Sequence, residues 1–295
     1  MRKGLLRGWS KGLTLGAALV GGATPSVASA QAPTLFQWNY GDGGEGLTAA
    51  EKLEEPLASD RPDFTEASST VGLGVVQLES GYTYTYDSND VGSTKSHSFP
   101  EALLRVGMLA EWFEFRIAQN YAEETTTDFG VSRTTETGAE DLYLGIKWGL
   151  TAQEGILPEM ALMTQMTVPS GASAFTAGET LPGVVWLYGW DVNDWIVTGG
   201  QTKADRALDD VTGDPFLEFS QSWTVGYSLA ESLGAYTEWF VIAPDGADTN
   251  HTENYADGGF TYSVTNNLQL DIRAGVGLNE AADDYFVGSG FAIRR

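Results

Sequence analysis

Apolar and polar residues alternate, segment after segment, from about residue 71 to the end of the sequence. The clearest stretch runs from Leu268 to Val276, where even positions are apolar and odd positions are polar or Gly. A period of two residues predicts a β-strand with one apolar face and one polar face. The pattern therefore predicts an all-β chain.

The alternation divides into twelve predicted strands with connections of two kinds. Short connections are expected at one end of the strands, and longer ones, including those near 87–96 and 123–137, at the other. This asymmetry with an even strand count is typical of outer-membrane barrels. Because hydrocarbon offers no hydrogen-bond partners, such a sheet must close on itself. The strands are expected near 72–86, 97–108, 112–122, 138–149, 157–168, 183–190, 194–202, 214–226, 232–242, 253–264, 268–278 and 284–294.

The two faces of several strands can be assigned directly. Phe113, Phe115 and Ile117 point one way, whereas Glu114 and Arg116 point the other way. Aromatic residues concentrate near the strand ends, as expected for the two girdles of a membrane barrel. These aromatic residues are Trp112, Trp148, Trp190, Trp195 and Trp223 beside short turns, and Tyr82, Tyr84 and Tyr86 toward the first long loop.

The N-terminal region differs from the rest of the chain. A basic start, an apolar run at 13–22 and the small residues Ala28-Ser29-Ala30 predict a signal peptide over residues 1–30. Residues 31–70 are acidic and Gly-rich, and Thr48 and Glu51 fit a capping box. We interpret 31–70 as a periplasmic tail or plug, with a disordered leader as the alternative. Residues 71–295 are then the outer-membrane barrel.

The charge of the chain excludes one class of partner. The sequence has 16 basic and 40 acidic side chains, and without the signal peptide the net charge is −28. Such a surface repels nucleic acid. The charge serves either solubility or an acidic rim or lumen that favours cations. The absence of cysteine excludes thiol nucleophiles, thiolate zinc sites and disulfides.

Two blocks of sequence resemble a known family. They are the block from Asp60 to Glu66 followed by 77–84, and the C-terminal hairpin over 270–279 and 282–291. They resemble the meta-pathway phenol-degradation family of outer-membrane transporters, over about residues 58–295. The resemblance implies an exported β-barrel associated with uptake of small, often aromatic, molecules. The C-terminus departs from many outer-membrane barrels, because the chain ends Phe291-Ala292-Ile293-Arg294-Arg295 and not on an aromatic residue. Either Phe291 serves the assembly role, or recognition by the outer-membrane insertion machinery differs.

Charged residues on the polar faces of the strands are the candidate lumen lining. They line a solute path, or they form an ion-pair network that largely closes a small barrel. We also expect Arg61 to enter the periplasmic mouth and pair with lumen carboxylates, while Asp60 and Asp63 meet lumen Arg or Lys. The lumen candidates are Glu79, Glu101, Arg105, Glu114, Arg116, Asp141, Lys147, Glu218, Glu238, Asp271 and Arg273, with Arg294 in the last strand.

Catalysis has little support in the sequence. His97 and His251 are the only histidines, and both are expected at loop edges. His97 beside Ser96 or Ser98 could begin a Ser–His arrangement, but no third group is evident to orient it. The acidic loops show no EF-hand spacing, so a solvated rim is favoured over a calcium site. We therefore expect no enzyme activity, no metal and no cofactor.

The sequence thus predicts a single-chain transmembrane antiparallel β-barrel of about twelve strands, with a short N-terminal tail or plug, in the outer membrane. The expected function is a channel or transporter that passively admits small molecules, aromatic or hydrophobic ones among them. The expected partners are the lipid bilayer, a small-molecule solute and the insertion machinery, with no nucleic acid. Two alternatives stay open: a non-transporting structural or adhesion barrel of the cell envelope, and a soluble exported β-sandwich that binds ligands.

Overall fold

The computed structural model describes residues 33–36, 48–209 and 211–295; the predicted signal peptide lies outside these ranges. Within them the chain has one short helix, α1 (Ala49–Lys52), and fifteen strands. The strands are β1 (Val76–Ser88), β2 (Gly92–Ser98), β3 (Ala102–Gly107), β4 (Phe113–Gln119), β5 (Tyr121–Asp128), β6 (Ser132–Ala139), β7 (Leu142–Thr151), β8 (Glu159–Val168), β9 (Leu181–Asn193), β10 (Ile196–Leu208), β11 (Pro215–Ala230), β12 (Leu233–Asp245), β13 (Glu253–Thr265), β14 (Leu268–Gly277) and β15 (Tyr285–Arg294).

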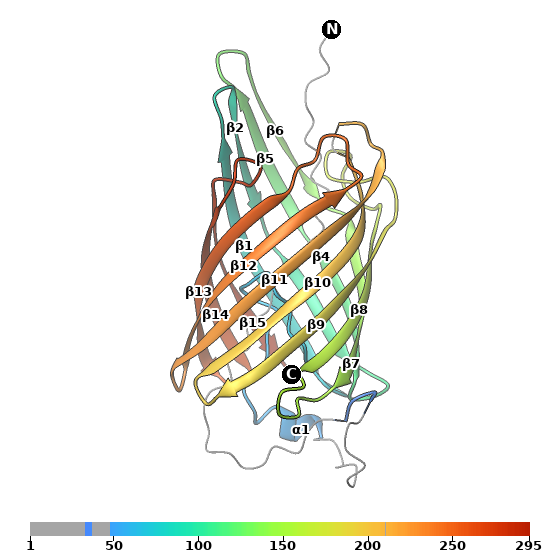
Figure 1. Cartoon of the computed structure of the whole chain (residues 1–295), viewed down its shortest axis with the longest axis vertical. Helices are drawn as coiled ribbons and strands as arrows, with labels where there is room; N and C mark the ends of the chain where they lie inside the picture. The colour runs from blue at the N-terminus through green and yellow to red at the C-terminus, as the bar shows by residue number, and fades with distance from the viewer. Residues whose placement is uncertain (1–32, 37–47, 210) are drawn as a thin grey trace.

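Twelve of these strands form a closed antiparallel barrel, as the sequence predicts (Figure 1). The wall runs from β15 down to β7, then through β4 and β3 to β1. The pairing of β1 with β15, from Gln77 with Arg294 to Tyr86 with Tyr285, closes it. Closure leaves no open sheet edge in the barrel wall, and it excludes the two-sheet sandwich that the sequence left open.

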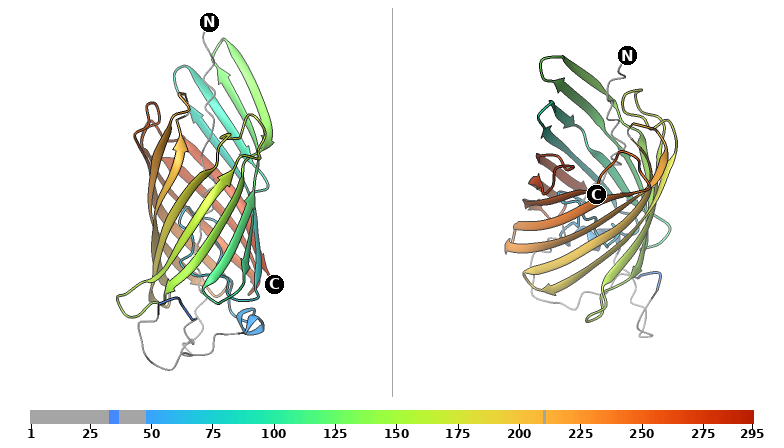
Figure 2. Two further views of the ribbon diagram at one scale, coloured as in Figure 1. Left: turned by 90° about the vertical axis from the view of Figure 1, so that its right-hand side faces the viewer. Right: turned by 45° about the horizontal axis from the view of Figure 1, so that its top comes forward.

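The remaining three strands extend one side of the barrel beyond its rim (Figures 1 and 2). The upper half of β1 pairs with β2, β2 pairs with β5, and β5 pairs with β6. The long loops expected near 87–96 and 123–137 are therefore wrong, because the turns contract to residues 89–91 and 129–131. The extension carries no lipid-facing apolar row, so it lacks the alternation by which the other strands were found, although its threonines suit a strand.

The burial of side chains follows the predicted faces of the wall strands. In β11, Leu217, Phe219 and Trp223 point outward and are 42–50% exposed, whereas Ser220 and Ser222 point inward and are at most 3% exposed. The exposed apolar side chains of the twelve strands form the surface that faces lipid. Within the described residues, no helix is long and apolar enough to cross a bilayer.

One part of the wall is apolar on both faces. Ala161 and Met163 of β8, with Val185 and Leu187 of β9, point inward and are fully buried. The neighbouring Trp186 points outward and is 47% exposed. A strand that contacts lipid outside and packed side chains inside loses its alternation, which explains why the pattern is weak over β9.

Candidate functional site

The chain enters the barrel from the end with the short turns. The capping box of Thr48 and Glu51 is formed at the start of α1, which lies at this mouth (Figure 1). The backbone N–H of Leu57 donates to the carbonyl of Asn266 at 2.9 Å, which anchors the chain to a short turn. We call residues 57–71 the lumen segment, since Figure 2 shows this chain inside the barrel before β1 begins. Residues 59–68 are all buried.

The lumen segment forms ion pairs with the barrel wall. The Asp60 carboxylate lies 3.1 Å from Arg105 Nη1 and 2.6 Å from Arg116 Nη1, and Lys147 Nζ lies 3.5 Å away. A Glu66 carboxylate oxygen forms an ion pair with Arg116 Nη2 at 2.9 Å. Burial alone would raise the pKa of Asp60, but Arg105 and Arg116 outweigh it and hold this pKa below its usual range. The segment therefore supplies the counter-charges for three cations on β3, β4 and β7.

Two carboxylates of the barrel wall, those of Glu79 and Glu114, also pair with these cations. Glu79 of β1 lies 3.1 Å from Arg105 Nη1, and Glu114 of β4 lies 2.8 Å from Arg105 Nε. Each also contacts the lumen segment, because Ser59 Oγ donates to Glu79 at 3.1 Å and the Val71 N–H donates to Glu114 at 2.9 Å. Buried charges are tolerated only when paired and hydrogen-bonded. The pairing found here ties the segment to the wall.

Arg61 lies in a slot on the opposite edge of β1. Its guanidinium contacts Glu101 at 2.8 Å and Asp271 at 3.2 Å, and its side chain is 2% exposed. Gly81 and Gly290, which face each other across β1 and β15, form the floor of the slot. A Cβ at Gly81 would lie 2.3 Å from Arg61 Cζ, and one at Gly290 would lie 2.4 Å from Arg61 Nε. The wall lacks side chains where Arg61 lies.

The backbone of the lumen segment is also bound by side chains of the wall. Glu238 of β12 accepts the N–H of Thr65 at 2.8 Å, and Gln201 of β10 donates to the Phe64 carbonyl at 2.9 Å. Lys147 of β7 donates to the Ala67 carbonyl at 2.8 Å. Polar groups from several sides of the barrel thus replace water around a buried, irregular backbone, as its burial requires.

The expectation for Asp63 is wrong. Within the described residues it forms no salt bridge, and both of its carboxylate oxygens are buried without a hydrogen-bond partner. Burial and the nearby carboxylates Glu238 and Asp257 raise its pKa well above the usual value. Asp60 and Glu66 form the ion pairs with the cationic side chains of β3, β4 and β7. Asp63 instead faces β12 and β13 on the other side of the barrel, where the nearest charged groups are acidic.

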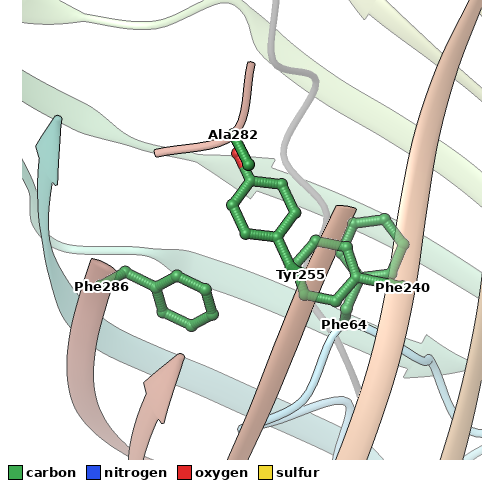
Figure 3. Close-up of a cluster of buried hydrophobic side chains, with 5 residues drawn as sticks. All are labelled: Phe64, Phe240, Tyr255, Ala282 and Phe286. Carbon is green, nitrogen blue, oxygen red and sulfur yellow. The ribbon is translucent and has the colours of Figure 1, made fainter. Parts of the chain in front are cut away.

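A cavity of about 200 Å³ lies between the lumen segment and the long-loop end. Arg61, Pro62 and Phe64 of the segment line one end of it. One wall is aromatic: Phe64 stacks on Phe240 with ring centres 4.2 Å apart, and Phe240 stacks on Tyr255 at 4.7 Å. Figure 3 shows these rings with Phe286, which completes the cluster.

The rest of the cavity lining is polar and mainly acidic. Beside six carboxylates there are two guanidinium groups, those of Arg61 and Arg273. Glu140 lies in the connection between β6 and β7, outside the spanning strands. Burial, together with Glu101 and Asp141, raises the pKa of Glu140 to about 7 despite the opposing effect of Asn120. The carboxylates are Glu101, Glu124, Glu140, Glu218, Asp257 and Asp283.

The other predicted residues have separate places. Glu218 and Arg273 line the cavity. Asp141 instead accepts the backbone N–H groups of residues 170, 171 and 177, and so fixes the loop before β9. Arg294 donates to Asn267 Oδ1 at 2.8 Å at the mouth near α1.

His97 belongs to an aromatic contact rather than to a Ser–His pair. Its Nδ1 lies 2.7 Å from Tyr82 Oη, and its ring centre lies 5.1 Å from that of Tyr84. Within the described residues, no three or more His, Asp or Glu side chains are arranged so that they could hold a metal ion.

Several residues of the site were not identified from the sequence. Glu66 stands in the resemblance block, but nothing distinguished it from Asp63. The aromatic wall combines residues of the lumen segment, β12, β13 and β15, so no local motif reveals it. Gly81 and Gly290 carried a weak signal, since isolated glycines in strands often mark a close approach.

Comparison with known proteins identifies a family and a solved structure with a similar fold. A family model described as "Putative MetA-pathway of phenol degradation" matches residues 59–294. An outer membrane channel from Pseudomonas putida F1 is similar, with 12% identity, a TM-score of 0.62, and coverage of 80% of this chain and 100% of that chain. The NanC porin (11% identity, TM-score 0.44, 74% and 98% covered) and the translocator domain of the autotransporter NalP from Neisseria meningitidis (12%, 0.47, 76% and 89%) also match. No curated protein sequence matches the chain. The shared fold, the closed wall and its outward apolar surface place the protein in the outer membrane.

Proposed function

The chain belongs to the family described as "Putative MetA-pathway of phenol degradation", and we propose that it is an outer-membrane channel that passively admits small molecules, aromatic and hydrophobic ones among them. The observation that carries this proposal is the cavity of about 200 Å³ inside the barrel. A barrel that served only as a rigid wall would have no need of an unfilled space with an aromatic side. Typical ligand pockets measure about 300–1,000 Å³, so the solutes are small.

The lumen segment acts as a plug in this proposal. It separates the cavity from the mouth near α1, because Arg61, Pro62 and Phe64 line the end of the cavity. Its ionic contacts with the wall are buried, so the docked position is the ground state. A solute can therefore cross the membrane only when the lumen segment is displaced from its docked position. The insertion machinery recognises the last strand, where Phe291 points outward and is 36% exposed.

The proposal is tested by reconstituting the full chain in liposomes and planar bilayers. We expect proteoliposomes to swell in small solutes and not in large ones, with protein-free liposomes as the control. We also expect brief single-channel openings. If no solute enters even after the segment is loosened by Arg61→Ala, the channel proposal fails. That outcome would favour the non-transporting structural or adhesion barrel.

A further inference from the structure

The two walls of the cavity differ in what they offer a ligand. One wall presents the faces and edges of Phe240, Tyr255 and Phe286, which bind apolar groups and rings (Figure 3). The opposite side presents Glu101 and Glu140 from the connections that precede β3 and β7. A molecule that fills the cavity therefore meets aromatic carbon on one side and carboxylate oxygen on the other.

Asn120 adds an unused acceptor to the acidic side. Its side chain is 6% exposed and lines the cavity. Its Nδ2 donates to Ser98 Oγ at 3.2 Å, but its Oδ1 is buried and has no hydrogen-bond partner. A buried acceptor without a partner costs about 1–3 kcal/mol. An N–H donor in the cavity would satisfy it, whereas a carboxylate or another acceptor would not.

The two guanidinium groups of the cavity are engaged through every nitrogen except Arg273 Nε, which is buried without a hydrogen-bond partner. Arg61 is held by Glu101 and Asp271. Arg273 donates to the Pro62 carbonyl at 2.9 Å and to Thr83 Oγ1 at 2.8 Å. Six lining carboxylates against two guanidinium groups leave the cavity net negative. An anionic solute would meet this excess of carboxylates, with Arg273 Nε as the one unpaired cationic donor, and would be repelled.

Cations also suit the aromatic side of the cavity. The guanidinium carbon of Arg273 already lies 5.5 Å from the ring centre of Phe286. Attraction between a cation and the face of an aromatic ring is strongest where water is excluded. A bare metal ion fits poorly, because no three or more His, Asp or Glu side chains of the described residues are arranged so that they could hold one.

We propose that this cavity is a binding site for small organic ammonium ions, with the apolar body on Phe240, Tyr255 and Phe286 and the N–H donors on Glu140 and Asn120. The inference names a solute class for the channel proposed above, and it rests on that function for transport only, because binding is measured separately. The preference follows from charge and acceptor geometry. It does not require an aromatic ring in the solute.

The test uses three probes of nearly equal size that differ in charge: benzylammonium, benzyl alcohol and benzoate. Their binding to the full chain in detergent is measured by calorimetry at pH 8 and low salt. We expect benzylammonium to bind about tenfold or more tightly than benzyl alcohol, as for a hydrogen bond to a charged group, and benzoate to bind least. Added salt should reduce the difference, because it screens the carboxylates.

Two matched variants locate the site. Glu140→Gln keeps the shape of the side chain and should weaken benzylammonium binding about tenfold, with benzyl alcohol unchanged. Glu231→Gln makes the same charge change in the exposed turn between β11 and β12 and should leave both affinities unchanged. Heat-modifiable gel migration verifies that each variant has a folded barrel. If Glu140→Gln does not fold, the three probes on the unaltered chain still decide.

Equal or tighter binding of benzoate or benzyl alcohol overturns the inference, as does an equal loss in Glu140→Gln and Glu231→Gln. Failure of this inference is distinct from failure of the channel. Solute flux together with equal binding of the three probes would refute the ammonium site and leave the channel proposal standing. Selective binding of benzylammonium without flux would support the site and count against the channel.

Discussion

Replacing Arg61 by Ala should loosen the docking of the lumen segment in the barrel. Arg61 is 2% exposed, and its partners Glu101 and Asp271 have side chains 10% and 0% exposed. The truncation removes both contacts at 2.8 and 3.2 Å and leaves two buried carboxylates without their cation. Repulsion and desolvation then act against the docked position.

The size of the effect follows from this burial. Removing one partner of a buried ion pair costs about 3–5 kcal/mol. Arg273 lies 4.0 Å from Glu101 and offers partial compensation, so we expect the lower end of that range. At about 1.4 kcal/mol per tenfold change, the docked-to-released ratio should fall by roughly two orders of magnitude.

The assay is single-channel recording in planar bilayers. Arg61→Ala should increase the fraction of time spent open by a large factor, with the conductance of the open state unchanged, because the wall is the same. Gly81→Ala should act in the same direction without any change of charge, because its new Cβ would lie 2.3 Å from Arg61.

Gly149→Ala is the matched control for the glycine variant. Gly149 also points inward from a wall strand, but a Cβ there meets no atom closer than 3.6 Å. It should behave like the parent. If Arg61→Ala and Gly81→Ala both record like Gly149→Ala, the segment does not control passage, and the reasoning about the plug is refuted.

Three further predictions concern titration and the loops. Burial and Glu238 raise the pKa of Asp63, so ionisation of Asp63 weakens docking of the lumen segment as the pH rises above the ordinary pKa of an aspartate. Asp63→Asn should therefore lower the open fraction of the channel at pH 8 and flatten the pH dependence of that fraction. An unchanged pH profile would contradict this. Burial raises the pKa of Glu140 to about 7, and the groups that face Glu140 are Glu101, Asp141 and Asn120. Calorimetry should therefore show that the affinity for benzylammonium falls as the pH drops below 7. A constant affinity from pH 8 to 6 would count against the ammonium site. Asp209 accepts hydrogen bonds from the backbone N–H groups of Val211 and Thr212 and, at 2.6 Å, from that of Thr249. Asp209→Ala should therefore hasten cleavage by proteinase K between β10 and β11. Equal digestion of the variant and the parent would show that Asp209 does not stabilise this loop.

The sequence predicts the wall of the barrel well, because alternate residues of each strand face lipid and the lumen and are therefore alternately apolar and polar. Where both environments are present, as in β4, the faces of Phe115 and Arg116 follow directly. Where a strand does not have lipid on one face and a polar lumen on the other, the alternation of apolar and polar residues is lost. The threonines of β5 and β6 extend beyond the barrel rim, and β9 has apolar residues on both sides.

The lumen was less accessible to sequence analysis for a different reason. Charge alone placed Arg61 against lumen carboxylates, and Glu101 and Asp271 are found there. The same logic failed for Asp63, because the register and the strand order decide which side of the barrel each residue faces. The aromatic cluster joins Phe64 to Phe240 across 176 positions of the chain, and only the closed barrel brings them together.

The central claim is that the lumen segment closes the channel, and a reversible lock tests it most directly. Thr65 Oγ1 and Ser222 Oγ lie 2.6 Å apart, and the chain has no cysteine of its own. In the triple variant Arg61→Ala, Thr65→Cys, Ser222→Cys, a disulfide would tie the segment to β11. The account predicts closed channels while the disulfide is intact and frequent openings after reduction. Equal conductance in both states, with the disulfide verified by mass spectrometry, would contradict it.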